Sequence, residues 1–237
     1  MIFPDPVLWK ELQDRVKTVF CDIGFQAETE MEIQTVRGTV NIDVIGFDNK
    51  HKPEITYLCE CKNWNSNVPK EKVHAFRSVV GDYGANFGII ISKRGFQKGA
   101  REAAKKTNIS LLNWTEFQQM FFDRWFDAKV ESLRHYAMPL VAYSEPLNCS
   151  RDGEFEKIKP SERQRKEFYR LIIEYSGFSM YLSQLYFGSI KDTISFPLED
   201  KELEIKVETA SHFFDELQKK CIAGLIKFDT LFGKEIR

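Results

Sequence analysis

The chain has 237 residues, of which 43% are hydrophobic and 29% are charged, and its formal net charge is −1. This composition is typical of a globular protein with one large domain or two small ones, and it argues against a protein that coats nucleic acid by charge alone. The short apolar runs, the lack of a secretory signal and five scattered cysteines without zinc-binding spacing predict a cytoplasmic protein with reduced cysteines and no membrane partner.

The hydrophobic pattern of the first 130 residues predicts alternating helices and strands. Apolar residues recur at three- and four-residue spacing from Leu8 to Ile23, which predicts a helix capped by Asp5. Residues 39–47 alternate as in a half-buried strand, and residues 87–92 are almost wholly apolar, as in a strand buried on both faces. The expected elements are, in order, a helix over 5–22, strands over 27–35, 39–47 and 54–62, a helix from 69 to about 84, a strand over 87–92, a helix over 97–107, a strand over 109–112 and a helix over 115–128.

A hairpin that leads into alternating helices and strands predicts an α/β fold, with a mixed central sheet flanked by helices. The pattern changes near residue 130, so we expect one domain over 1–130 and a C-terminal region over 131–237. Residues 138–160 contain three prolines and resemble a linker, whereas 161–175 and 211–228 predict helices and 193–209 alternates like a strand. The C-terminal region is therefore expected to be mainly helical α+β.

Positive charge is concentrated between Lys70 and Lys106, where nine basic residues accompany three acidic ones. Such a stretch suits a groove that meets phosphates, but it also describes two solvated helix faces, and both interpretations remain open. The residues we expect to contact phosphates are Lys70, His74, Arg77, Lys93 and Arg94.

Two carboxylates and an ammonium are expected to meet on the second and third strands. Side chains alternate along a strand, so Glu60 and Lys62 share a face, and a hairpin can bring Asp43 beside Glu60. Crowded carboxylates repel each other unless a cation lies between them, and Mg²⁺ accepts carboxylate oxygens and a backbone carbonyl such as that of Cys61. Lys62 could then hold an attacking water and stabilise charge on a phosphate.

The Glu-x-Lys pattern is weak on its own, because it is common on solvent-facing edge strands. Its context favours a functional site: Asp43 lies 17 residues upstream in an Ile-Asp-Val strand, and a basic helix follows.

Several segments resemble the Mrr-like restriction endonucleases of the PD-(D/E)xK nuclease superfamily over about residues 5–120. The segments that carry the resemblance are Gly38–Gly46, Leu58–Trp64, Val68–Val73, Phe87–Ser92, Gly95–Ala103 and Ile109–Asn113. It implies a restriction-endonuclease-like core, Asp43 and Glu60 as metal ligands and Lys62 as the catalytic lysine. It also implies that a glutamate of the first helix completes the site, for which Glu11 is the best match; Ile42 replaces the usual proline before Asp43.

The resemblance implies a DNA endonuclease that uses Mg²⁺, for which Mn²⁺ can substitute, in restriction or antiphage defence. Cutting both strands of a duplex favours a dimer or a larger homo-oligomer, with the C-terminal region serving oligomerisation, target sensing or binding of a defence-system partner. Two alternatives remain: the same site acting on branched DNA, single strands or RNA, and a non-catalytic DNA-binding or scaffold subunit.

Overall fold

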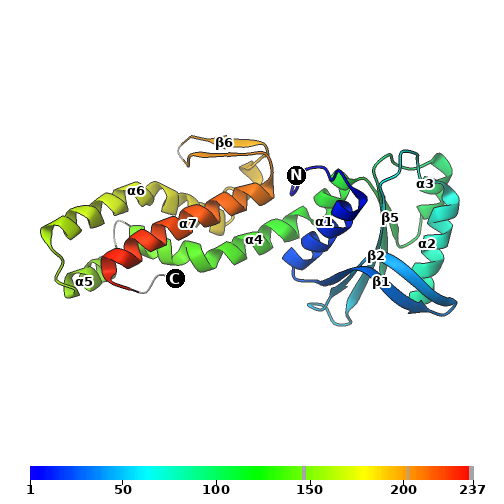
Figure 1. Cartoon of the computed structure of the whole chain (residues 1–237), viewed down its shortest axis with the longest axis horizontal. Helices are drawn as coiled ribbons and strands as arrows, with labels where there is room; N and C mark the ends of the chain where they lie inside the picture. Colours follow the sequence, from blue (N-terminus) through cyan, green and yellow to red (C-terminus); the bar gives the residue numbers. More distant parts are fainter. Residues whose placement is uncertain (146–147, 202, 235–237) are drawn as a thin grey trace. The chain divides into compact units, whose positions relative to one another are not determined.

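A computed structural model of the chain describes residues 1–145, 148–201 and 203–234 (Figure 1). The chain divides into two compact units, Met1–Ala128 and Lys129–Arg237. Helix α4 (Trp114–Ser144) begins in the first unit and ends in the second. Within the described residues, every helix is too short or too polar to span a bilayer.

The first unit contains the mixed five-stranded sheet that the sequence predicts. Its elements before α4 are α1 (Trp9–Asp22), β1 (Gln26–Thr35), β2 (Gly38–Asp48), β3 (Ile55–Lys62), α2 (Lys70–Tyr83), β4 (Phe87–Ser92), α3 (Lys98–Ala104) and β5 (Ile109–Leu112). The strands lie in the order β1-β2-β3-β4-β5. The pairs β1–β2 and β2–β3 are antiparallel, whereas β3–β4 and β4–β5 are parallel. Strand β3 is therefore the point at which the sheet changes direction.

Helices cover both faces of this sheet (Figure 1). On one face, Leu58 and Ile90 of the sheet belong to a buried cluster that includes Val73 and Phe76 of α2. On the other face, α1 approaches β2 so closely that a Cβ atom at Gly46 would lie 2.6 Å from a ring carbon of Phe20. This close contact fixes α1 against the strand that carries Asp43.

Helix α1 begins at Trp9, four residues later than the sequence predicts, and Asp5 does not cap it. The backbone amides of Val7 and Leu8 precede the helix. They donate hydrogen bonds at 2.7 and 3.4 Å to the carboxylate of Glu11, which lies in its first turn. The same carboxylate pairs with Arg15 one turn further on. The expected cap at Asp5 is therefore wrong, and its carboxylate is left free of the helix.

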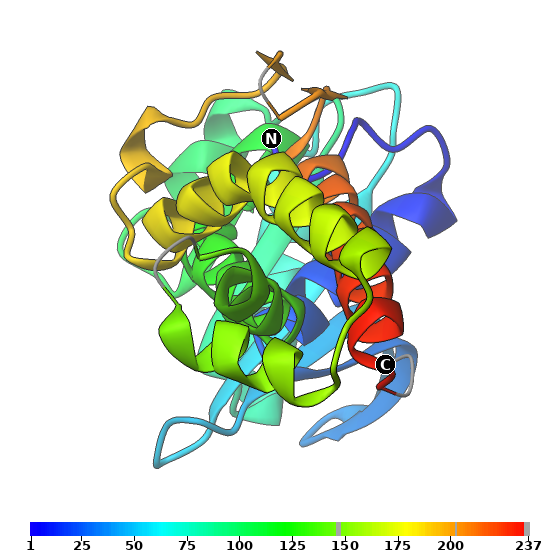
Figure 2. The ribbon, with the colours of Figure 1, turned by 90° about the vertical axis from the view of Figure 1, so that its left-hand side faces the viewer.

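The second unit is mainly helical, as predicted, but its first part differs from the expectation. Its further elements are α5 (Cys149–Lys157), α6 (Glu162–Tyr186), the short 3₁₀ helix η1 (Lys191–Thr193), β6 (Leu198–Asp200), β7 (Ile205–Val207) and α7 (Ala210–Phe232) (Figure 2). The helix expected to end near residue 128 runs on past Pro139 to Ser144, and much of the supposed linker is α5. The rest of that linker includes residues 146 and 147, which lie outside the described residues.

A buried arginine of α5 binds the chain at the end of α4. Arg151 of α5 is 4% exposed and donates hydrogen bonds to the carbonyls of Tyr143 and Glu145 at 2.7 and 2.6 Å. A cation that binds carbonyls at the C-terminal end of a helix stabilises that end. The pairing joins α5 to α4 across a segment that proline content alone predicts to be irregular.

Candidate active site

The candidate site forms where β2 and β3 stop pairing. Their antiparallel ladder runs from Asp48↔Ile55 to Val44↔Cys59. Two residues beyond Cys59, the amide of Cys61 donates a 2.6 Å hydrogen bond to Oδ2 of Asp43. The Asp43 carboxylate therefore reaches across to β3, beside the face to which alternation directs Glu60 and Lys62.

The three side chains that the sequence predicts to meet do converge. The Lys62 ammonium hydrogen-bonds the Glu60 carboxylate, and its Nζ lies 4.0 Å from Oδ2 of Asp43. The exposed fractions of the three side chains are 17% for Asp43, 18% for Glu60 and 21% for Lys62. The cluster is thus shielded on most sides but still open to a ligand from solvent.

Charge within this cluster is only partly balanced. Burial raises the pKa of Glu60 above its usual value, and the neighbouring Asp43 raises it further. The hydrogen bond and charge of Lys62 act in the opposite direction, as does the charge of Lys72 on α2. Two carboxylates in one shielded site favour a bound cation, because a cation relieves their repulsion. Lys72 was not among the expected site residues, and only the fold brings its charge near Glu60.

Helix α1 contributes Gln13 rather than the expected Glu11. The Gln13 amide nitrogen donates to Oδ1 of Asp43 at 3.1 Å, whereas the Glu11 carboxylate is bound to its own helix start. Residues two apart on a helix point about 200° from each other, so both cannot face the sheet. Gln13 is therefore the α1 side chain that contacts Asp43, whereas Glu11, expected to complete the site, contacts the start of its own helix. Its signal in the sequence was a polar side chain beside the buried Leu12 and Val16.

The oxygen atoms around Asp43 fit a hard divalent cation. Oε1 of Gln13 is buried and has no hydrogen-bond partner among the described residues. The carbonyl of Cys61 accepts a 3.0 Å hydrogen bond from Trp9 Nε1, and a carbonyl oxygen has a second lone pair. Among the described residues, no group of three or more histidine, cysteine, aspartate and glutamate side chains is placed to hold a metal ion. A cation here would therefore rely on two carboxylates, on amide or carbonyl oxygens and on water, which suits Mg²⁺.

The expected phosphate-contacting residues are not part of the three-residue cluster. Four of them, Lys70, His74, Arg77 and Arg94, are exposed. Lys93 is also exposed, but its backbone amide donates to the Lys62 carbonyl at 3.1 Å, so it directly adjoins the cluster. The indole of Trp64 lies under the Lys62 ammonium, 5.6 Å from nitrogen to ring centre.

A mixed five-stranded sheet flanked by helices is a restriction-endonuclease-like fold, and here two carboxylates and a lysine gather at its β2–β3 junction. Comparison with family models assigns the same class, because residues 5–121 match the Mrr catalytic-domain family, described as a restriction endonuclease. This segment, residues 5–121, is a domain of the Mrr-like restriction endonuclease family, as the sequence predicted.

A comparison with curated proteins finds no match. A solved structure titled "Crystal Structure of Protein of Unknown Function AF1548" is 16% identical, with a TM-score of 0.41. The similarity covers 76% of this chain and 98% of that one.

Proposed function

We propose that the chain is a Mg²⁺-dependent endonuclease that hydrolyses phosphodiester bonds in DNA and serves in restriction or antiphage defence. The observation that carries this proposal is the convergence of Asp43, Glu60 and Lys62 in one shielded cluster within a restriction-endonuclease catalytic domain. Mn²⁺, also a hard cation with a preference for oxygen ligands, would substitute for Mg²⁺ at the same atoms.

Each residue of the cluster has a separate task in this proposal. Asp43, held by Gln13 and the Cys61 amide, and Glu60 supply carboxylate oxygens for the cation. The bound cation would lower the pKa of a coordinated water and neutralise charge on the phosphate. Lys62 orients the attacking water and donates a hydrogen bond to the phosphate oxygen that gains charge in the transition state. The leaving 3′ oxygen takes its proton from solvent, which the open side of the cluster admits.

A scaffold role fits these contacts less well than catalysis does. Burial raises the pKa of Glu60, and the nearby Asp43 adds to the shift, so the arrangement disfavours the charged carboxylate. Keeping two carboxylates close together in a shielded site costs free energy, and a protein that only binds DNA gains nothing from it. A cation-binding enzyme needs both carboxylates.

The test is cleavage of supercoiled plasmid by the purified chain, with Mg²⁺ and with a chelator. We expect cleavage with Mg²⁺ alone, and its loss, by a factor of about 100 or more, in Lys62→Ala, because that variant lacks the charge-stabilising donor. Lys52→Ala, which removes an exposed lysine of the same unit, should cut like the unaltered chain. Normal cutting by Lys62→Ala would reject the mechanism.

We also propose the division of roles expected from the sequence, with the nuclease within residues 1–130 and oligomerisation, partner binding or target sensing in residues 131–237. A cytoplasmic homo-oligomer supplies two sites for the two DNA strands. Running the cleavage assay on duplex, junction, single-stranded and RNA substrates, beside a mass measurement, identifies the substrate and the assembly.

A further inference from the structure

A cavity in the first unit lies beside the end of β3, next to the residue that follows Lys62. It encloses about 290 Å³ and lies at the carboxyl ends of three neighbouring parallel strands. Asn63 follows β3, Lys93 follows β4 and Asn113 follows β5, and all three line the cavity. Open α/β sheets bind ligands at this edge, where the loops after the strands leave a crevice. The position therefore favours a ligand site over a packing defect.

Residues that line the cavity are chain neighbours or backbone hydrogen-bond partners of the candidate site. Asn63 is the residue after Lys62, and the Lys93 amide donates to the Lys62 carbonyl at 3.1 Å. Leu12, which closes the cavity from α1, precedes Gln13, the hydrogen-bond partner of Asp43. A nucleotide next to a phosphate held by Lys62 would thus lie at the mouth of this cavity.

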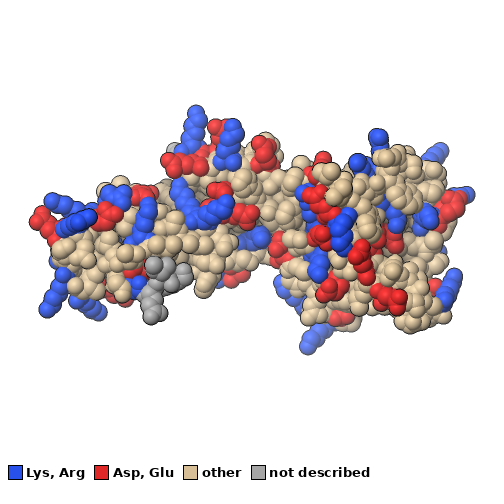
Figure 3. Space-filling view, viewed as in Figure 1, with Lys and Arg blue, Asp and Glu red and all other residues tan. Residues whose placement is uncertain are grey.

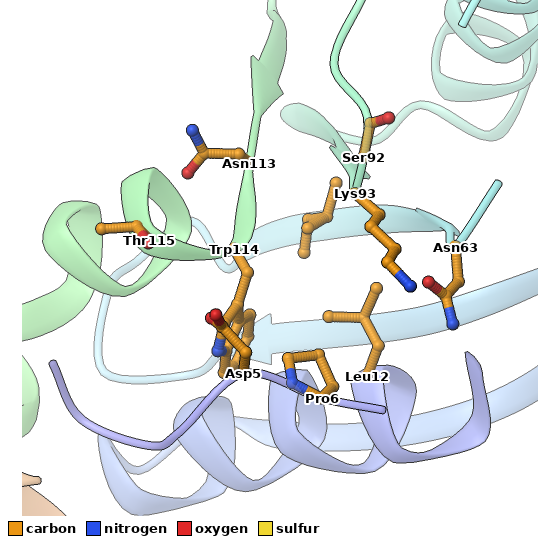
Figure 4. Close-up of a pocket in the computed structure, with 10 residues that line it drawn as sticks. Asp5, Pro6, Leu12, Asn63, Ser92, Lys93, Asn113, Trp114 and Thr115 are labelled. Carbon is orange, nitrogen blue, oxygen red and sulfur yellow. The ribbon is translucent and has the colours of Figure 1, made fainter. Parts of the chain in front are cut away.

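The walls of the cavity combine an apolar surface with uncommitted polar groups. Leu12 and the indole of Trp114 provide apolar lining, and Figure 4 shows Asp5 beside Trp114 on one side, with Lys93 and Asn63 on the other. Within the described part of the chain, the Asp5 carboxylate and the Lys93 ammonium make no hydrogen bond or ion pair. The Asn113 carbonyl is occupied by the Glu116 amide, which leaves its NH₂ group as a donor.

These groups distinguish between ligand classes. The unpaired negative charge of Asp5 opposes a phosphate on its side of the cavity, so a phosphate fits only beside Lys93 on the other side. A nucleobase instead fits the apolar wall, and an exocyclic amine on the base can donate to the Asp5 carboxylate. The volume lies just below the roughly 300–1,000 Å³ of common small-molecule sites, which suits one nucleotide and excludes a duplex.

We propose that this cavity receives one nucleobase, turned out of the DNA stack beside the cleaved bond, and selects bases that carry an exocyclic amine through Asp5. Lys93 binds the phosphate of the same nucleotide. The inference rests on the proposed function, because it assigns the cavity to the substrate of the neighbouring site.

The test is binding of the four deoxynucleoside monophosphates to the full chain in a chelator, measured by calorimetry. We expect dAMP, dCMP and dGMP to bind about tenfold more tightly than dTMP, which lacks the amine, since a hydrogen bond to a charged group has about that effect. Asp5→Ala should remove the preference, whereas Lys93→Ala should weaken the binding of all four nucleotides to the same extent. Asp14→Ala, at an exposed carboxylate of α1, serves as the matched control and should keep the preference.

Equal or absent binding of the four nucleotides, or a preference that survives Asp5→Ala, would overturn the inference. The plasmid assay separates this failure from failure of the proposed function. A chain that cuts plasmid without base preference is a nuclease with an unused cavity. A chain that discriminates bases but does not cut has the pocket without the proposed chemistry.

Discussion

At the scale of single residues, Gln13 connects α1 to the proposed chemistry. It is fully buried, it orients Asp43 through one amide atom, and its other amide atom has no partner among the described residues. A side chain that holds a metal ligand typically changes metal affinity by about 10- to 100-fold when it is removed. Gln13 therefore has a measurable role that does not depend on observing cleavage.

We expect Gln13→Ala to weaken Mg²⁺ binding by about tenfold or more, because Asp43 loses a hydrogen bond and the site loses an oxygen. The measurement is calorimetric titration with Mg²⁺. Glu11→Ala is the matched comparison two residues away: it should lower the free energy of unfolding through loss of the helix cap, with unchanged Mg²⁺ affinity. The reverse pattern would restore Glu11 as the residue that completes the site.

At the scale of secondary structure, local patterns predicted the strands better than the helix ends. Strands β4 and β5 were predicted with their observed bounds, because a buried strand reads as an apolar run between polar turns. Alternation along β2 and β3 was also enough to direct Asp43, Glu60 and Lys62 to one place. Hydrophobic periodicity could not locate the start of α1 or the end of α4, because polar contacts decide them. Glu11 satisfies amides three and four residues before it, and Arg151 of another helix satisfies carbonyls near the end of α4.

Periodicity also could not decide between Glu11 and Gln13 as the α1 residue that contacts Asp43. A helix that begins at residue 5 and one that begins at residue 9 have the same periodicity, so the pattern does not say which polar residue meets the sheet. The contact between Phe20 and Gly46 sets the rotation of α1, and this contact joins segments that are 26 residues apart.

Strand β2 ends in a buried carboxylate that makes stability depend on pH. Asp48 is fully buried, which by itself raises its pKa, but Arg124 and His51 pair with it and the net pKa lies below the usual value. A lowered pKa in the folded state contributes stability above the unfolded pKa of about 3.9. That contribution is lost as the pH falls through the folded pKa.

We expect Asp48→Asn to lower the free energy of unfolding by about 1–3 kcal/mol at pH 7, because hydrogen bonds to a charged partner are lost. The difference from the unaltered chain should persist at pH 5 and shrink by pH 3. Urea unfolding at the three pH values measures it, with Glu54→Gln as the exposed control. A difference that stays constant down to pH 3 would contradict this role for the pair.

At the scale of the whole molecule, positive charge is concentrated in one stretch of the chain, and the chain as a whole has no positive excess. Acidic and basic side chains are interspersed over the face in Figure 3, and the net charge is −1. The nine basic residues between Lys70 and Lys106 are all exposed, so the expected basic stretch is available to solvent. A few local phosphate contacts, rather than a general positive field, would then hold DNA.

Arg94→Ala in a Lys62→Ala background should weaken binding to any duplex and reduce the salt slope of log K by about 0.9, the value for one lost phosphate contact. Fluorescence anisotropy at several salt concentrations measures the slope. Lys157→Ala, at an exposed position of the second unit, should leave it unchanged. An equal slope in the Arg94 variant would remove this residue from the interface.

The placement of the five cysteines has a practical consequence. Cys59, Cys61 and Cys221 are buried, whereas Cys21 on α1 and Cys149 on α5 are exposed. Maleimide dyes should therefore label the natural chain at one thiol in each unit and spare the two that flank Glu60. Energy transfer between such dyes would report whether the distance between the two units changes when DNA is added, without any engineered attachment point.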